Sequence, residues 1–194
     1  MKSSVNVYDD ALPRYVRSEL YEFLINQDWK FGAYSTSETN FFRYWYKHFG
    51  GFFVGNEKLD PSTFEAELPV EVGRFWDELK QGPCKNHTLM RCYANAYPYG
   101  SEGAVHTDIG EVAAWGRYFT ALYYPHLRWD VDWGGETLFF NDARDDLVAA
   151  VYPKPGRLIV FDSKIPHVAR PLSRKCPELR ITLMFKTEIK TGVE

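Results

Sequence analysis

The amino-terminal part of the chain places apolar residues with the 3.6-residue period of an α-helix. A helix is predicted over about residues 11–27, with Pro13 in its first turn. Its apolar positions are Leu12, Val16, Leu20, Phe23 and Leu24. A second helix is predicted from near Pro69 to the Gly82-Pro83 stop. Its apolar face consists of Val72, Phe75, Trp76 and Leu79.

From about residue 88 the pattern changes to short strand-like runs separated by turns that contain glycine and proline. The runs are Leu89–Ala96, Tyr118–Tyr124, Thr137–Phe140, Leu147–Val151, Arg157–Phe161 and Arg180–Lys186. Many short strands without intervening helices indicate a sandwich or jelly roll. We therefore expect one domain over residues 1–194, mainly β, with helices in 1–87 packed on a jelly-roll core in 88–188.

An aromatic-rich segment, residues 39–51, lies between the two predicted helices and ends in Gly50-Gly51. Aromatic residues are frequent in strands, so one interpretation is a core strand followed by a turn. The other is a lid or wall over a substrate pocket. The two interpretations are compatible with each other.

Composition narrows the class of protein. Of 194 residues 45% are hydrophobic and 17% aromatic, which excludes a disordered chain and suits a β-rich core with a pocket. A net charge of −3 makes nucleic acid an unexpected partner. No signal peptide or membrane-spanning run is recognisable, and we expect a cytoplasmic protein. We also expect three reduced thiols, at Cys84, Cys92 and Cys176.

The first candidate for chemistry is the pair His106 and Asp108. Residues i and i+2 of an extended segment point to the same side, so the imidazole and the carboxylate can converge. A histidine and an aspartate at this spacing are by themselves weak evidence for a metal site. The alternative is that the two residues lie on the surface or in a turn. His167 follows the strand-like run 157–161 after a short turn. Two histidines and one carboxylate form the facial triad of non-haem iron(II) oxygenases, which leaves coordination positions open.

Arg180 is the second candidate. In the run Arg180–Phe185, the alternate residues Ile181, Leu183 and Phe185 form a core face, and Arg180 lies on the other face. A buried guanidinium needs an anionic partner, and it can hold a carboxylate through two hydrogen bonds. An exposed arginine at a strand end is the alternative.

The order of these motifs resembles the catalytic domain of the prolyl-4-hydroxylase-type 2-oxoglutarate/iron(II) dioxygenases. The matching pieces are Arg91-Cys92-Tyr93, His106-Thr107-Asp108, residues 119–124, Trp133-Gly134-Gly135-Glu136-Thr137, residues 155–161, Pro166-His167 and Arg180-Ile181-Thr182. The resemblance covers about half of the chain. It implies a double-stranded β-helix, with Fe(II) as cofactor and 2-oxoglutarate and O₂ as co-substrates.

The resemblance also implies roles for individual residues. The iron ligands would be His106, Asp108 and His167, and Arg180 would hold the distal carboxylate of 2-oxoglutarate. Further contacts to 2-oxoglutarate would come from Tyr93, Tyr124 and Thr182. The gap between His167 and Arg180 is longer than in similar proteins, so Arg170 and Arg174 are competitors for the role of Arg180. A carboxylate at position 108, where related halogenases have a small residue, implies hydroxylation or a related oxidation, with release of succinate and CO₂, and not halogenation.

The substrate stays open: an amino acid, a peptidyl residue or another small metabolite. The flanking aromatic-rich segments offer the candidate contacts Arg43, Trp45, Tyr46, Trp115, Arg117 and Trp133, and packing roles are the alternative for each. The remaining histidines, His48, His87 and His126, are expected to be structural. Rival functions are a cupin-like metal enzyme that is not an oxygenase and a non-catalytic binding module. An AlkB-like nucleic-acid demethylase is disfavoured by the acidic net charge, and the oligomeric state is not predicted.

Overall fold

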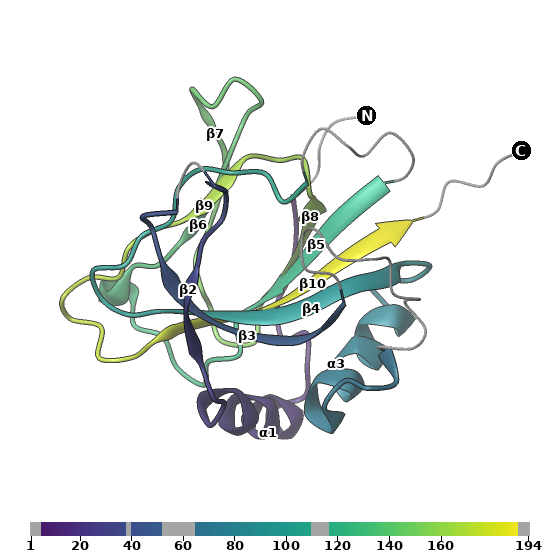
Figure 1. Ribbon diagram of the computed structural model, residues 1–194. Helices are drawn as coiled ribbons and strands as arrows, with labels where there is room; N and C mark the ends of the chain where they lie inside the picture. Colours follow the sequence, from purple (N-terminus) through teal and green to yellow (C-terminus); the bar gives the residue numbers. More distant parts are fainter. Residues whose placement is uncertain (1–4, 38–39, 52–64, 110–116, 190–194) are drawn as a thin grey trace, which may run out of the picture.

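The computed structural model describes residues 5–37, 40–51, 65–109 and 117–189. In these residues the strands form two antiparallel sheets, and the helices α1 and α3 lie beneath the larger sheet (Figure 1). Within the described residues the large sheet has the order β1-β8-β5-β10-β4-β3-β2, and the small sheet has the order β7-β6-β9. The bounds in the large sheet are β1 (Val5–Tyr8), β2 (Lys30–Ala33), β3 (Tyr44–Gly51), β4 (Thr88–Tyr97), β5 (Arg117–Tyr123), β8 (Leu158–Asp162) and β10 (Arg180–Ile189). The small sheet contains β6 (Thr137–Phe140), β7 (Leu147–Val151) and β9 (His167–Ala169).

The two helices, α1 (Arg14–Ile25) and α3 (Val70–Gln81), cover the outer face of the large sheet (Figure 1). Each helix begins directly after a proline whose backbone is still extended. Trp76 of α3 stacks on Phe185 of β10, with ring centroids 5.5 Å apart. Burying each large apolar side chain in this cluster contributes roughly 1.5–3 kcal/mol. The outer face therefore supplies a large part of the folding free energy.

A second apolar cluster lies on the inner side of the large sheet, where the small sheet covers it. Phe139 of β6 packs edge-on against Phe161 of β8, with centroids 4.9 Å apart. This cluster does not fill the whole space between the sheets, because polar side chains of β4 and β10 occupy the neighbouring positions. The inner face thus combines a packed part with a polar cavity.

The structure confirms the main elements expected from the sequence. Both helices are present, although α1 is shorter at each end than residues 11–27, and all six predicted runs contain strands. The aromatic segment 39–51 contains β3, a strand, and its residue Tyr44 is buried. The strands β1, β2 and β9 were not predicted: β1 is a mostly exposed edge strand, and β9 has only three residues. None of the helices in the described residues has the length and apolar character needed to cross a membrane.

Candidate metal centre and co-substrate pocket

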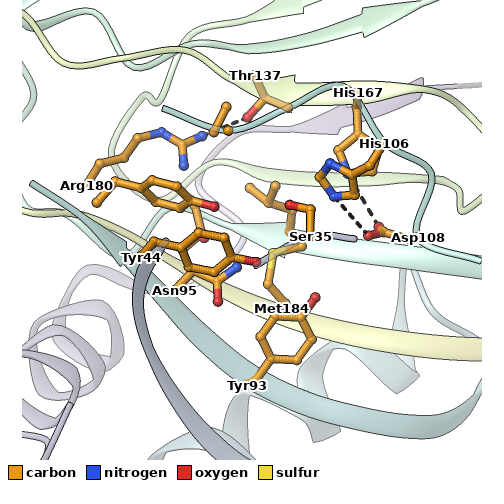
Figure 2. Close-up of a pocket in the computed structure, with 15 residues that line it drawn as sticks. Ser35, Tyr44, Tyr93, Asn95, His106, Asp108, Thr137, His167, Arg180 and Met184 are labelled. Carbon is orange, nitrogen blue, oxygen red and sulfur yellow. Dashed lines mark hydrogen bonds and ion pairs between the residues drawn. The ribbon is translucent and has the colours of Figure 1, made fainter. Parts of the chain in front are cut away.

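His106, Asp108 and His167 come together at one point between the sheets (Figure 2). One potential ligand atom from each lies within 4.8 Å of the others, and no other group of this kind occurs among the described residues. The backbone positions the two histidines. The His106 N–H donates to the His167 carbonyl at 3.1 Å, and the His167 N–H donates to the His106 carbonyl at 2.9 Å. The loop before Asp108 is thereby tied to the start of β9.

The histidine side chains are oriented by their Nδ1 atoms. His106 Nδ1 lies 2.9 Å from the Ala104 carbonyl oxygen, and His167 Nδ1 lies 2.9 Å from that of Ile165. A carbonyl can only accept, so each Nδ1 carries the proton and each Nε2 keeps a free lone pair. The two Nε2 atoms lie 3.6 Å and 3.5 Å from the oxygens of Asp108. Burial lowers the pKa of His167 to about 4, so this imidazole is neutral near pH 7 and able to bind a metal.

Hydrogen bonds and an ion pair also fix the position of Asp108. Its N–H donates to the Ser163 carbonyl at 2.9 Å, and Thr120 Oγ1 donates to its Oδ2 at 2.6 Å. Lys186 Nζ forms an ion pair with the same oxygen. Burial acts to raise the pKa of Asp108, but the Lys186 ammonium holds this pKa well below its usual range. Asp108 is therefore ionised, and two lone pairs and one carboxylate oxygen fit a single Fe(II) ion.

A narrow cavity runs from this triad toward Arg180 (Figure 2). Arg180 is 1% exposed, and no acidic partner for its guanidinium occurs among the described residues. Its Nε donates to the Gly135 carbonyl at 2.6 Å, and its Nη2 donates to Thr137 Oγ1 at 2.8 Å. These neutral acceptors orient the guanidinium without neutralising its charge. A buried cation in the wall of a cavity, oriented only by neutral acceptors, suits a ligand with a carboxylate.

Gly135 allows this arginine to approach the backbone. Its φ of +80° lies in the left-handed region, and a Cβ there would lie 2.8 Å from Leu172 Cδ2 and 3.1 Å from Arg180 Cδ. A side chain at position 135 would therefore strain the backbone and push against Arg180. This contact gives a structural reason for the second glycine of the Trp133–Thr137 motif.

Arg170 and Arg174, the alternatives to Arg180 as the residue that holds 2-oxoglutarate, are both exposed. Arg180 is buried and lines the narrow cavity. Of the other residues expected at the co-substrate pocket, Tyr93 and Thr182 line the narrow cavity. Tyr124 is buried behind it, where its hydroxyl lies 2.6 Å from Thr137 Oγ1 and 3.5 Å from Arg180 Nη2. Tyr124 thus contacts the arginine and Thr137.

Among the candidate substrate contacts that the structure describes, only Tyr46 lines a cavity that adjoins the triad. Tyr46 lines a second, larger cavity of about 780 Å³, whose described wall does not include Arg43, Trp45 or Arg117. Trp45 alternates with Tyr46 along β3 and faces outward, where its ring lies 5.2 Å from that of Phe31. Trp115 lies outside the described residues.

For Trp133 the structure favours the alternative interpretation, a packing role. Trp133 is 9% exposed and belongs to a separate apolar cluster on the 3₁₀ turn Val131–Trp133. Its partners in this cluster are Trp129, Leu172 and Cys176. The indole therefore packs against Trp129 and against the loop that precedes β10.

Several residues of the site were not identified from the sequence. Lys186 and Thr120 contact Asp108, and Arg91 lines the larger cavity beside Lys186. The alternation that places Arg180 on the inner face also places Lys186 there, six residues later, so this signal was present. Thr120 carried no comparable signal. His126, by contrast, is structural as expected: its Nε2 accepts from the Ile181 N–H at 3.0 Å in the core.

Comparison with known proteins supports the assignment of His106, Asp108 and His167 as a metal centre. Residues 92–185 match the family model described as the 2OG-Fe(II) oxygenase superfamily. No curated protein shows significant sequence similarity to the chain. A prolyl-4-hydroxylase from Pseudomonas putida is 20% identical, with a TM-score of 0.59 over 98% of this chain and 95% of that chain.

Two further solved structures share the fold at lower identity. A prolyl hydroxylase from Trichoplax adhaerens, in complex with a hypoxia inducible factor peptide fragment, is 17% identical, with a TM-score of 0.63 over 97% of this chain and 84% of that chain. HygX from Streptomyces hygroscopicus, with nickel and 2-oxoglutarate bound, is 11% identical, with a TM-score of 0.63 over 96% of this chain and 83% of that chain. These likenesses confirm the double-stranded β-helix. With its His106, Asp108 and His167 triad and the match over residues 92–185, the chain belongs to the 2OG-Fe(II) oxygenase superfamily.

Proposed function

We propose that this protein is a dioxygenase that hydroxylates an unactivated C–H bond of an amino acid, a peptidyl residue or another small metabolite. In the overall reaction one oxygen atom of O₂ enters the substrate as a hydroxyl group. The other enters succinate, which forms from 2-oxoglutarate with loss of CO₂. Two electrons from the C–H bond and two from the decarboxylation together reduce O₂, so the reaction needs no further reductant.

The observation that carries this proposal is the buried charge of Arg180. A cupin-like metal enzyme or a binding module on this fold would have no need for a guanidinium that neutral acceptors orient but do not neutralise. A distal carboxylate of 2-oxoglutarate would supply the missing negative charge. The cavity between Arg180 and the triad joins this charge to the metal centre.

The roles of the residues follow from their contacts. His106, His167 and Asp108 would hold Fe(II), which supplies the redox chemistry that activates O₂. Thr120 and Lys186 hold Oδ2 of Asp108 and leave Oδ1 available to the metal. Arg180 and Thr137 would orient the co-substrate, and Tyr93 and Thr182 would line its path. The small sheet covers this path and limits the access of water to it.

The direct test is an anaerobic titration of the metal-free protein with Fe(II) and 2-oxoglutarate. A visible charge-transfer band should appear only when both are present. The loaded protein should then release succinate in air, and a panel of amino acids, peptides and small metabolites should identify compounds that accelerate this release. Absence of the band in the wild-type protein would contradict the proposal.

Asp108→Ala gives the matching loss-of-function prediction. Substitution of second-sphere partners of metal ligands costs about 10–100-fold in affinity or activity, and loss of a ligand should exceed this range. We expect at least about a hundredfold loss of Fe(II) affinity, measured by equilibrium dialysis. Asp142→Ala, in the exposed turn between β6 and β7, is the control and should bind Fe(II) as the wild type does. Equal affinities in both variants would remove Asp108 from the site.

A further inference from the structure

Arg180 lies at the beginning of β10, where this strand extends past one of its two neighbours. On one side β10 pairs with β4 from Arg180 onwards. On the other side its register with β5 begins at Leu183. Residues 180–182 therefore have a paired strand on one side, and their position depends on what contacts them on the other.

His126 makes this contact in place of a strand. The Ile181 N–H donates a hydrogen bond to His126 Nε2 at 3.0 Å, and the imidazole is completely buried. Burial and the nearby charge of Arg180 lower the pKa of His126 to about 3, so the ring is neutral near pH 7 and Nε2 keeps its lone pair. Since a buried N–H without an acceptor costs folding free energy, the ring fixes the backbone of the residue next to Arg180.

The same ring adjoins the group that orients the Arg180 side chain. The centroids of the His126 and Trp129 rings lie 4.3 Å apart. Trp129 Nε1 donates to the Gly134 carbonyl at 3.0 Å. The next carbonyl, that of Gly135, accepts from Arg180 Nε at 2.6 Å. His126 therefore supports the backbone beside Arg180 directly and the acceptor of its guanidinium through Trp129.

The metal centre is supported by other contacts. The backbone N–H and carbonyl groups of His106 and His167 pair with each other, and Asp108 is held by side chains of β5 and of the far part of β10. A change at His126 should therefore disturb the distal end of the co-substrate pocket more than the metal centre.

We propose, resting on the function proposed above, that His126 is a positioning residue for 2-oxoglutarate, because it holds Arg180 in the orientation that meets the distal carboxylate. A guanidinium that binds a carboxylate through two hydrogen bonds needs both at a suitable angle, so a small rotation weakens the contact. Loss of the His126 contact should weaken recognition of the distal carboxylate and leave recognition of the 2-oxo acid group unchanged.

The test compares 2-oxoglutarate with 2-oxopentanoate, a 2-oxo acid of the same chain length without the distal carboxylate. Anaerobic titration of the Fe(II)-loaded protein, followed by the charge-transfer band, gives the affinity for each compound. The ratio of the two affinities, the distal-carboxylate preference, does not depend on the fraction of protein that is folded. In the wild-type protein we expect a preference of at least about thirtyfold, since 2-oxopentanoate lacks one partner of the buried charge pair.

The variants remove the contacts one at a time. In His126→Leu, which lacks the acceptor, the distal-carboxylate preference should fall about tenfold. In His126→Gln, whose Oε1 is as many bonds from Cβ as Nε2 is, it should stay within about twofold of the wild type. Trp129→Phe keeps an aromatic ring but removes the donor to Gly134, and the preference should fall about threefold. Fe(II) affinity, measured by equilibrium dialysis, should be unchanged in all three variants.

His87→Leu is the matched control, because His87 contacts the other end of the same strand. Its Nδ1 lies 2.8 Å from Oγ1 of Thr187. Thr187 follows Arg180 by seven residues, which corresponds to roughly 20 Å along a strand. We expect the full distal-carboxylate preference in His87→Leu, whatever its free energy of unfolding.

The outcomes distinguish this inference from the proposed function. A wild-type preference in His126→Leu, or in Trp129→Phe if His126→Leu does not fold, overturns the positioning role. An equal loss in His87→Leu also overturns it, because any contact with β10 would then have the same effect. An equal loss in His126→Gln does so too, because the acceptor would then not matter. A wild-type protein that binds both compounds equally contradicts the role of Arg180 in the proposed function, and this inference with it.

Discussion

Alternate residues of strand β10 point to opposite faces of the sheet, and the side chains on these two faces differ in polarity. On the outer face Ile181, Leu183 and Phe185 are almost completely buried against the helices. On the inner face Arg180 is equally buried, but it is a cation without an acidic partner among the described residues. One face removes apolar area from water, and the other keeps a charge away from water.

This difference indicates that stability and function are separable in this fold. Apolar burial on the outer face stabilises the sheet whether or not a ligand is bound. A buried uncompensated charge on the inner face costs folding free energy, which a ligand carboxylate would recover on binding. Outer-face substitutions should therefore change the free energy of unfolding, and inner-face substitutions should change ligand affinity.

The largest expected effect of this kind is on stability. Phe185→Ala removes a ring that packs against Trp76 and Phe75, and truncation of a core phenylalanine costs about 3–5 kcal/mol. Urea denaturation of the metal-free protein measures this loss, and the affinity of the folded fraction for 2-oxoglutarate should be unchanged. Phe41→Ala, at a residue 70% exposed, is the control and should stay within about 0.5 kcal/mol. A larger effect on affinity than on stability would show that the faces are coupled.

For Arg180→Met we expect the opposite pattern, a loss of affinity for 2-oxoglutarate without a loss of stability. Removing one partner of a buried charge pair costs about 2–5 kcal/mol in binding, so the affinity for 2-oxoglutarate should fall at least about thirtyfold. The free energy of unfolding of the metal-free protein should stay the same or rise, because an uncompensated buried charge is removed. Arg174→Met, on the surface, is the matched control. An unchanged requirement for 2-oxoglutarate in Arg180→Met would show that another cation holds the co-substrate.

Much of this comparison could be predicted from the sequence. Period-2 alternation in residues 180–185 assigns Ile181, Leu183 and Phe185 to the core, and the structure confirms this assignment. The order of short motifs predicts the triad, whose side chains the structure brings together. The first prediction depends on local geometry, because side-chain direction follows from strand period. The second depends on the resemblance to a known family, because His167 is far from His106 and Asp108 in the sequence.

The remaining features depend on contacts between distant segments. The pairing of Lys186 with Arg91 needs the register of β10 on β4, and the contact of Lys186 with Asp108 needs the path of a loop. The two interpretations of Trp133 stayed open for the same reason, because an aromatic residue beside a motif can face a cavity or a neighbouring loop. Only the fold decides between these two surroundings.

Gly135→Ala tests how closely the backbone supports the inner face. A non-glycine residue in the left-handed region costs about 1–3 kcal/mol, and here the new Cβ would also contact Arg180. We expect a stability loss in this range together with weaker binding of 2-oxoglutarate. Gly100→Ala has the same φ of +80° and no atom within 4 Å of the added Cβ, so it isolates the backbone strain. Equal 2-oxoglutarate affinities in the two variants would show that the contact with Arg180 does not matter.

The smallest expected effect comes from a charge cluster outside both faces. Asp9 accepts hydrogen bonds from Lys154 at 2.8 Å and from Arg157 at 2.7 Å, and these cations lower its pKa to about 2. Because the folded-state pKa lies below the unfolded value of 3.8, the contribution to stability is present above that value. It is lost as the pH falls through 2. The Asp9 side chain is 40% exposed, so solvent screening limits the contribution to less than about 1 kcal/mol.

Asp9→Asn should therefore lower the free energy of unfolding slightly at pH 7, and the difference from the wild type should shrink below pH 4. Urea titrations at pH 7 and pH 3 measure both values, with Asp142→Asn as the exposed control. A loss of several kcal/mol at pH 7 would contradict this expectation, because it would require the cluster to behave like the buried charges around Asp108. A small loss would instead support the contrast that runs through the molecule, in which a charge has a large effect only where water is excluded from it.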